Sequence, residues 1–503
     1  MNEPPGRDID EILISAAGGE TRIALLAGGR LGELEVARPS LQSVAGNIYV
    51  GRIDKVIPSI EAAFVEVGLS RSGFLALAET RPVGARGDTI ADYVAEGDPV
   101  LVQVLRDAAG DKGAKLTSRI SLAGRYLVLT PSAAEPAEVR VSRRIGDEAA
   151  RDRLAARLGE LAVDGESFIV RTAAGEAGAG DLAGEVAFLR AEWREIAEKR
   201  HAAKPPALVH AELDPARRAL RDAAGPGLWR IAVDDAIVLA GLKGYCRDFA
   251  PDLAGRLELH QGAEDIFAAD DIEAQIEAAL SPAVGLPSGG SIVIGETAAL
   301  TAIDVNTGGG AGGRSKEDTA LLTNLEAAAE IARQIRLRNL SGLLVADFVP
   351  MKRSPNVAKV LDALRGAVAG DPCPTHVIGT TRLGLVEMTR RKKRDSLINL
   401  LNAPCPACSG NGRARSPESV AYQALRAVRR AAAAAPHAAI SLSASPRVIE
   451  ALGGPAAAAL KEAGEKLGRA IRLRADETLA GDAFDIAPVA GKGRMGGGND
   501  RER

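Results

Sequence analysis

Two aspartates and an asparagine lie in apolar segments that are typical of buried strands. The segment "LTAIDVN" contains Asp304 and Asn306, and "GLLVADF" contains Asp347. Side chains two residues apart share one face of a strand, so Asp304 and Asn306 point the same way. Carboxylate and amide oxygens suit a hard cation such as Mg²⁺, which keeps several waters and also binds substrate phosphate. The residues alone also allow a simpler role, in which each acid caps its strand or pairs with an arginine.

A predicted helix between these two segments determines the relative direction of the two strands and therefore the positions of their carboxyl ends. Residues 317–338 carry apolar side chains at helical spacing and follow the glycine-rich stretch "TGGGAGGRS" at 307–315. A strand, a loop, a helix and a second strand form a unit whose strands run parallel, and function gathers at the carboxyl ends of such strands. The order of the elements therefore predicts that Asp304 and Asp347 reach the same edge of one sheet.

The C-x-x-C pair Cys405 and Cys408 supplies two of the four ligands that a structural zinc ion needs. The chain has no second C-x-x-C, and none of its five histidines lies near this pair in the sequence. A second copy of the chain would complete the site with its own two thiolates, so zinc would join two protomers. A redox dithiol and a pair of unliganded surface thiols remain alternatives. We expect Cys246 and Cys373 to be ordinary buried or loop thiols.

Residues 43–120 contain five short apolar segments separated by turn residues, which predicts a small OB-type barrel. Phe64 and Phe74 fall on neighbouring predicted strands, where two exposed rings would stack on unpaired bases. The alternative is that both rings belong to the core of the barrel. Lys112, in a turn at the rim, would contact a phosphate.

A second β-rich stretch, residues 121–215, carries Arg171 and Thr172 at the end of a predicted strand, followed by a glycine-bearing loop. An arginine fork beside a hydroxyl and loop amides forms a reasonable phosphate pocket, although the pattern alone is common.

Length and charge limit the classes of protein that fit. A chain of 503 residues suggests about three or four domains. The net charge of -3 gives no overall attraction for nucleic acid, so the basic run "TRRKKR" at 389–394 is either a local polyanion site or a solvated face. Residues 1–20 lack the features of a secretory signal and no long apolar run follows, so we expect a cytoplasmic protein without a membrane span.

Taken in order, these segments resemble the ribonuclease E/G family of bacterial endoribonucleases over nearly the whole chain. The resemblance is carried by "NIYVGRI", "EAAFVEVG", "LPSGGSIVI", "LTAIDVNTG", "LGLVEMTRR" and "CPACSGNG". The segments "AIDVNTG" and "EMTRRKKRDSL", with no long acidic or proline-rich scaffold after the small domain, are more similar to ribonuclease G than to full-length ribonuclease E.

The resemblance implies a multi-domain α+β and α/β architecture. Its expected parts are a ribonuclease H-like fold (1–42 and 216–279), an inserted OB-fold barrel of the S-one type (43–120), a 5′-sensor (121–215), a deoxyribonuclease I-like catalytic domain (280–402), a zinc link (403–415), a small α/β dimerisation domain (416–488) and a disordered tail (489–503).

The resemblance also implies roles for single residues. Residues matching Asp304 and Asp347 bind Mg²⁺ in the family, and the residue matching Asn306 assists. Cys405 and Cys408 match the pair that shares zinc between protomers, which implies a homodimer and leaves open a tetramer of two dimers.

Two further sets of residues are expected to contact RNA. Single-stranded RNA is held in the family by residues matching Phe64, Phe74 and Lys112. The pocket for a 5′-monophosphate is formed by residues matching Val128, Arg171, Thr172 and Arg382.

The implied activity is Mg²⁺-dependent cleavage of single-stranded RNA that prefers 5′-monophosphorylated substrates and leaves a 5′-phosphate and a 3′-hydroxyl, in ribosomal RNA processing, messenger RNA decay or both. Cleavage through the 2′-hydroxyl would need two positioned imidazoles.

One departure is Pro350, which stands in "DFVPM" where family members usually carry a second acid. It gives support to an alternative, a non-catalytic RNA-binding or assembly protein of the same architecture. A DNA nuclease is a third interpretation, less favoured because the expected barrel and sensor are of RNA-binding type.

Overall fold

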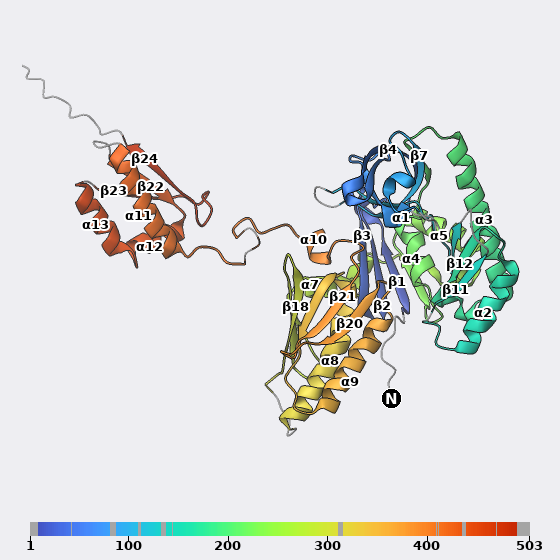
Figure 1. The fold of residues 1–503 in the computed structure, drawn as a ribbon. Coiled ribbons are helices and arrows are strands. Elements are labelled where there is room, and N and C mark those ends of the chain that lie inside the picture. The colour runs from blue at the N-terminus through green and yellow to red at the C-terminus, as the bar shows by residue number, and fades with distance from the viewer. Residues whose placement is uncertain are drawn as a thin grey trace, which may run out of the picture. The chain divides into compact units, whose positions relative to one another are not determined.

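The structure is a computed structural model that describes residues 9–41, 43–80, 87–108, 112–131, 137–142, 144–309, 315–408, 410, 412–434, 439–468 and 470–489. The chain divides into two compact units, Met1–Leu400 and Leu401–Arg503, and each is described by itself (Figure 1). Of the expected disordered tail (489–503), Val489 is instead the last residue of a strand, and residues 490–503 lie outside the described residues. None of the described helices combines the length and apolar character that a membrane span requires.

A five-stranded sheet joins the beginning of the first unit to residues more than two hundred positions later, because β1 pairs in parallel with β14. Across the sheet the strands are β15 (Leu257–Leu259), β14 (Arg230–Val233), β1 (Glu11–Ser15), β2 (Thr21–Ala27) and β3 (Arg30–Ala37). The turn between β2 and β3 needs positive φ at two positions, which Gly28 and Gly29 supply. The apolar core of this region also contains residues of α4 (Pro215–Ala223) and α5 (Ala236–Phe249). The short helices α6 (Ile266–Ala269) and α7 (Ile272–Leu280) follow in the chain.

A closed barrel occupies the segment for which five strands were predicted, and the prediction of a five-stranded, OB-like barrel is confirmed. Its strands are β4 (Ile48–Ile57), β5 (Ala62–Glu66), β6 (Gly73–Ala76), β8 (Lys115–Thr117) and β7 (Pro99–Arg106), and β7 closes the barrel on β4. Val65, Leu75 and Leu116 are fully buried inside it. The helix α1 (Leu77–Thr80) follows β6, and β13 (Ala207–His210) adds to β4 from outside the barrel.

A four-stranded sheet and two helices form the next region. The strand order is β11 (Glu138–Val141), β12 (Glu166–Val170), β10 (Leu127–Pro131) and β9 (Leu122–Ala123), and the helices are α2 (Glu148–Leu161) and α3 (Ala179–Ala202). The apolar core of this region includes Leu154, Leu158 and Phe168. The sequence analysis did not predict α2, whose start is capped by the side chain of Asp147.

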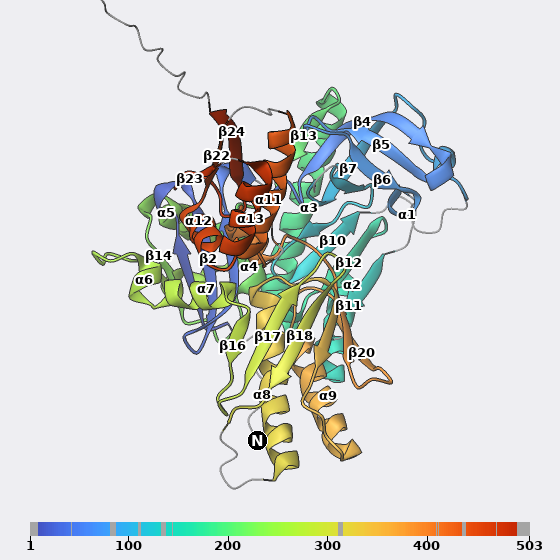
Figure 2. The same cartoon turned by 90° about the vertical axis from the view of Figure 1, so that its left-hand side faces the viewer.

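A six-stranded sheet carries the two predicted strands that contain the acids. The strand order is β16 (Ala283–Gly285), β17 (Ser291–Glu296), β18 (Leu300–Asn306), β19 (Gly342–Asp347), β21 (Val386–Arg390) and β20 (Thr375–Thr380). The helices α8 (Lys316–Leu337) and α9 (Ser354–Ala369) lie side by side on one face of this sheet (Figures 1 and 2). Ile303, Val305, Leu344 and Ala346 face these helices and are buried. The side chains that alternate with them therefore lie on the opposite, open face. The short α10 (Leu397–Leu401) follows β21 in the chain.

The second unit is a small α/β domain. Its sheet has the order β23 (Ile471–Ala475), β22 (Ala439–Ala444) and β24 (Phe484–Val489), and its helices are α11 (Pro417–Ala434), α12 (Pro446–Gly453) and α13 (Ala457–Leu467). The outer strands β23 and β24 were not predicted from the sequence.

Candidate active site and RNA-binding residues

The structure brings Asp304 and Asp347 together. The strands β18 and β19 run parallel, and Asp304 lies directly opposite Asp347 in their register. Neighbouring strands in a sheet are about 4.8 Å apart, and paired residues point to the same face. Both aspartates are exposed on the open face, whereas Ile303 and Val305 point to the helices. The Asn306 side chain donates a hydrogen bond from Nδ2 to Asp304 Oδ2 at 2.8 Å.

The described residues leave both carboxylates available to a cation. No lysine or arginine within the described ranges forms an ion pair with Asp304 or Asp347. No three histidine, cysteine, aspartate or glutamate side chains gather around one point in the same ranges. A cation at this place would therefore take two carboxylates and water as ligands, with the Asn306 side chain bonded to Asp304. That donor set suits Mg²⁺, which keeps several of its waters when protein-bound.

A third acid on the open face was not predicted from the sequence. Glu387 on β21 lies opposite Val345 of β19, two residues before Asp347, and is exposed. It is therefore a diagonal neighbour of Asp347 and not its partner. The signal that would have indicated it is the alternation of "VEMTR", in which Glu387 separates the buried Val386 and Met388.

The loop after Asp347 is fixed by side chains of α8. Asn324 is fully buried and bonds both backbone groups of Val349, accepting from its N–H at 2.9 Å and donating to its carbonyl at 2.9 Å. Glu317 accepts hydrogen bonds from the amides of Lys352 and Arg353, and these bonds lower the pKa of its carboxyl group. The exposed Pro350 lies between these two attachments. The loop is thus held in place without an acid at position 350.

Phe64 and Phe74 are cross-strand partners on β5 and β6. Their ring centroids are 6.0 Å apart with an interplanar angle of 69°, an edge-to-face contact. Both side chains are half-buried and neither belongs to the buried cluster that fills the barrel. Lys112, just before β8, is exposed. This surface offers two aromatic edges and a nearby ammonium group, which fits base stacking and a phosphate contact.

The residues expected at the 5′-phosphate pocket are only partly together. Thr172 Oγ1 lies 3.3 Å from Ser142 Oγ, beside Arg171 at the end of β12. The half-buried Val128 is on β10, next to β12. Arg382 is exposed between β20 and β21, and no hydrogen bond or ion pair joins it to Arg171 or Thr172 in the part of the chain that the structure describes.

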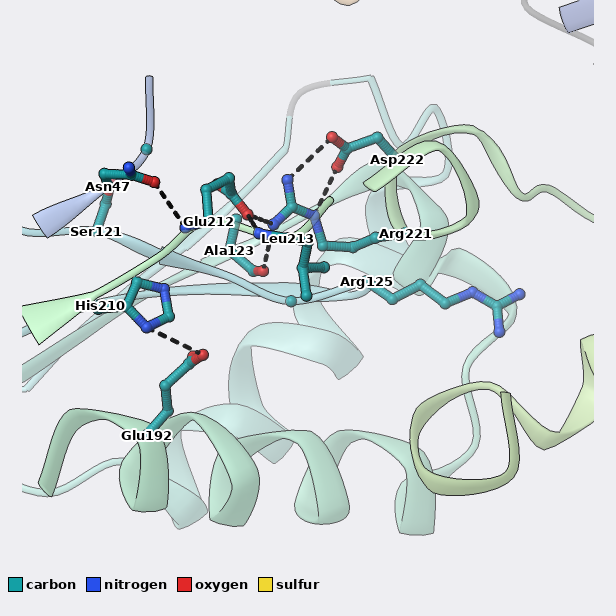
Figure 3. Close-up of polar contacts among 12 residues, drawn as sticks. Asn47, Ser121, Ala123, Arg125, Glu192, His210, Glu212, Leu213, Arg221 and Asp222 are labelled. Atoms are coloured by element: carbon teal, nitrogen blue, oxygen red, sulfur yellow. Dashed lines mark hydrogen bonds and ion pairs between the residues drawn. The ribbon is translucent and has the colours of Figure 1, made fainter. Parts of the chain in front are cut away.

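Arg171 already has a partner that the sequence did not indicate. Its guanidinium group donates to Asp222 Oδ1 at 2.8 Å and to the carbonyl of Gly124. Asp222 also accepts two hydrogen bonds from Arg221, each at 3.1 Å (Figure 3). Burial alone would raise the pKa of Asp222, but the hydrogen bonds and charges of Arg221 and Arg171 lower it to about 2. The carboxylate is therefore ionised throughout the physiological range.

The network continues from Arg221 to the barrel. Arg221 donates to Glu212 at 2.8 Å and to the carbonyl of Ala123 at 3.2 Å. The backbone N–H of Glu212 in turn donates to the side chain of Asn47, one residue before β4, at 2.9 Å (Figure 3). A continuous chain of polar contacts thus connects the end of β12 to the first strand of the barrel.

A cavity of about 640 Å³ borders this network. On its wall, His210 Nδ1 lies 3.8 Å from a carboxylate oxygen of Glu192, on α3 (Figure 3). Burial, with a smaller contribution from the charge of Glu212, raises the pKa of Glu192 to about 7. Burial also lowers the pKa of His210. Burial therefore disfavours the charged form of each group.

The C-x-x-C pair forms a tight turn in the second unit. Cys405 is exposed, and its carbonyl accepts from the N–H of Cys408 at 3.3 Å. Hydrogen bonds from the N–H groups of Ala407 and Cys408 lower the pKa of the Cys405 thiol, which favours the thiolate that binds metals. Cys246 and Cys373 are buried, as expected.

The basic run at 389–394 is partly structural. Arg390 is buried in an ion pair with Asp371, at 2.7 Å. Lys392 pairs with Asp395 at 2.9 Å. The run is therefore not a continuous free polyanion site, nor is it only a solvated face.

Comparison with known proteins identifies relatives along the whole chain. A model of the ribonuclease E/G family matches residues 121–393, and one described as "RNase E/G, Thioredoxin-like domain" matches residues 404–489. The chain is 36% identical over 486 residues to ribonuclease G of Escherichia coli K12, covering 95% of this chain and 99% of that protein. It is 34% identical over 490 residues to ribonuclease G of Haemophilus influenzae, again with 95% and 99% covered.

Ribonuclease E of Haemophilus influenzae is 41% identical over 416 residues, which cover 81% of this chain but 44% of that protein. In overall architecture the chain is therefore closer to ribonuclease G than to ribonuclease E. Together these matches show that the chain belongs to the ribonuclease E/G family.

Proposed function

We propose that the chain hydrolyses phosphodiester bonds of single-stranded RNA with Mg²⁺ and leaves a 5′-phosphate and a 3′-hydroxyl. Its family membership supports the broader statement, that it is an endoribonuclease of RNA processing. The observation that carries the finer proposal is the register of β18 and β19, which sets Asp304 opposite Asp347 on an exposed face.

Asp304 and Asp347 would hold the cation. When bound, Mg²⁺ lowers the pKa of a water and stabilises the charge that develops on the phosphorus. Asn306 positions Asp304, because its hydrogen bond occupies Oδ2 and leaves Oδ1 free. The open face has one histidine among the described residues, His376 on β20, two strands from β19. A route through the 2′-hydroxyl with two imidazoles has no support from this arrangement.

The other regions would select the substrate. We assign the RNA-binding barrel to residues 43–120, with Phe64, Phe74 and Lys112 holding an unpaired strand. We assign the 5′-sensor to residues 121–215, where Arg171 and Thr172 with Val128 and Arg382 prefer a 5′-monophosphate. Residues 1–42 and 216–279 form the ribonuclease H-like part and residues 280–402 the deoxyribonuclease I-like catalytic part. Cys405 and Cys408 would share zinc with a second copy, and the substrates would be cytoplasmic ribosomal or messenger RNA precursors.

The test is cleavage of a labelled single-stranded RNA with Mg²⁺ or with EDTA. Asp304→Asn and Asp347→Asn should each abolish cleavage and leave RNA binding largely intact, because binding is assigned to the barrel. Asp362→Asn is a matched control, since this exposed acid lies on α9 and pairs with Arg365. Undiminished cleavage by both active-site variants would exclude this site.

The second candidate is a non-catalytic RNA-binding protein, favoured by Pro350 in place of an acid. The same assay separates the two, since such a protein would bind the RNA and leave it uncut with or without Mg²⁺. The fixed loop around Pro350 supports the enzyme, because Asn324 and Glu317 hold the backbone there without help from position 350.

A further inference from the structure

One exposed face of α11 in the second unit is basic. Arg426 and Arg430 lie one turn apart on the helix and are both exposed. They line a shallow groove together with Ser419 and Gln423 of the same helix and Arg415, which precedes the helix. Arg415 donates a hydrogen bond to Gln423 across this groove.

This face points away from the core of the domain. The opposite side of α11 is buried through Val420, Ala424 and Val428. Because side chains three and four residues apart lie one above the other on a helix, the half-buried Gln423 and the exposed Arg426 and Arg430 form one row. The helix has one acidic residue, Glu418. It lies in the first turn, where its negative charge interacts favourably with the positive end of the helix dipole.

The charge of the row is not neutralised by the protein. Within the described residues, neither Arg426 nor Arg430 forms an ion pair. By contrast, the exposed face of α13 pairs its lysines with acids one turn away, Lys461 with Glu465 at 4.0 Å and Lys466 with Glu462. The two helices therefore differ, since α13 has the mixed charge of an ordinary solvated surface and α11 keeps an uncompensated positive row.

An aromatic ring accompanies the arginines. Tyr422 lies one turn before Arg426 on the helix, and 38% of it is exposed. Exposed aromatic rings beside arginines provide a stacking surface for unpaired bases, while guanidinium groups bind the phosphates between them.

We propose that the arginine stripe, defined as Arg415, Arg426 and Arg430 with Tyr422 at its edge, is a second binding surface for single-stranded RNA. Residues one helical turn apart have Cβ atoms about 5–6 Å apart, so long arginine side chains reach successive phosphates of one strand. The inference rests on the proposed function only because it takes RNA as the polyanion that the protein binds. The stripe would add a contact in the small domain to the RNA contacts proposed for the barrel.

Binding measured as a function of salt tests the stripe. The parent is full-length Asp304→Asn, and the probe is a long fluorescent single-stranded RNA with a 5′-hydroxyl end. The stripe variant adds Arg426→Gln and Arg430→Gln, and the matched control adds Lys461→Gln and Lys466→Gln. All four positions are exposed on helices of the same unit, and both pairs remove two positive charges. Glutamine keeps the helix propensity, so folding is preserved.

Each phosphate contact on a single strand contributes about 0.7 to the slope of log Kd against log salt concentration, so the stripe variant should lose about 1.4. The control should keep the slope of the parent. Tyr422→Leu should weaken binding about 5-fold or more with the slope unchanged, because stacking releases no counterions.

The proposal is overturned if the stripe variant has the same salt slope as the control. This includes the case in which both variants lose slope equally, which would indicate a general effect of charge. A parent that binds no RNA overturns both the stripe and the proposed function. Normal cleavage by the wild-type chain together with an unchanged slope in the stripe variant overturns the stripe alone.

Discussion

At the residue scale, Arg171 would have two duties, one structural and one in the proposed 5′-sensor. Arg171 is the residue assigned to the 5′-phosphate, yet it is held by Asp222. In the proposed sensor an incoming phosphate would exchange with a carboxylate and would not meet a free cation. Asp222 would remain bonded to Arg221 during that exchange, so its charge would keep a partner. The two arginines should consequently respond differently to removal.

Arg171→Ala should remove the preference for 5′-monophosphorylated RNA and lower the free energy of unfolding by no more than about 1–2 kcal/mol. Arg221→Ala should cost about 3–5 kcal/mol, because two carboxylates, Asp222 and Glu212, lose their buried partner. Urea unfolding and the ratio of kcat/KM for monophosphate and hydroxyl RNA measure the two effects. A retained preference in Arg171→Ala would place the sensor elsewhere, and equal stability of the two variants would contradict the supporting role of Arg221.

Glu192 gives a pH-dependent prediction. Its folded pKa of about 7 is above the ordinary value of 4.5, so folding favours its protonated form. The associated stability is complete below the unfolded pKa and is lost as the pH rises through the folded one. Glu192→Gln should therefore match the wild type near pH 4 and exceed its unfolding free energy by about 1–3 kcal/mol at pH 8. Denaturant unfolding across this range measures the difference, and a gain that does not depend on pH would contradict burial of the charge as the cause.

At the element scale, the sequence predicted those site residues whose positions follow from the order of neighbouring strands and helices along the chain. The strand, helix and strand around 300–347 can form only one compact unit, so Asp304 and Asp347 could be expected at one sheet edge. Glu387 and Asp222 were not predicted, because each reaches its place through pairing with distant segments. The outer strands β23 and β24 were missed for a similar reason, since each exists by pairing with β22.

The loop after β19 is held from outside by two side chains of α8, Asn324 and Glu317, of which Asn324 is fully buried. Asn324→Ala would leave the N–H and the carbonyl of Val349 without partners, at a cost of about 2–4 kcal/mol. Because the same loop follows Asp347 directly, cleavage should fall even at a temperature where the variant is fully folded. Thermal unfolding and single-turnover cleavage test the two parts. Wild-type cleavage by a destabilised variant would show that the loop does not influence the site.

At the scale of the whole molecule, polar contacts connect regions that are far apart in the sequence. Arg125 binds Asp252 through two hydrogen bonds, at 2.6 and 2.9 Å, which join the turn between β9 and β10 to the residues after α5. Arg144 donates to the carbonyl of Asp371, close to β20 of the six-stranded sheet. The contact between Asn47 and Glu212 adds the barrel to these connections. The barrel, the four-stranded sheet, the five-stranded sheet and the six-stranded sheet of β18 and β19 therefore belong to one connected first unit.

The proposed zinc-linked dimer would depend on the second unit, and its test is the stoichiometry of zinc. A shared site of four thiolates predicts one zinc ion for two chains, and chelation should convert the dimer to protomers. Cys405→Ser should lose both zinc and dimer, because the site would keep only one thiolate from each chain. Cys373→Ala, which changes a buried thiol away from the C-x-x-C turn, should keep both. Metal analysis with light scattering measures the outcome. One zinc ion per chain, or a dimer that survives both chelation and Cys405→Ser, would show that the pair serves some other purpose than joining two copies.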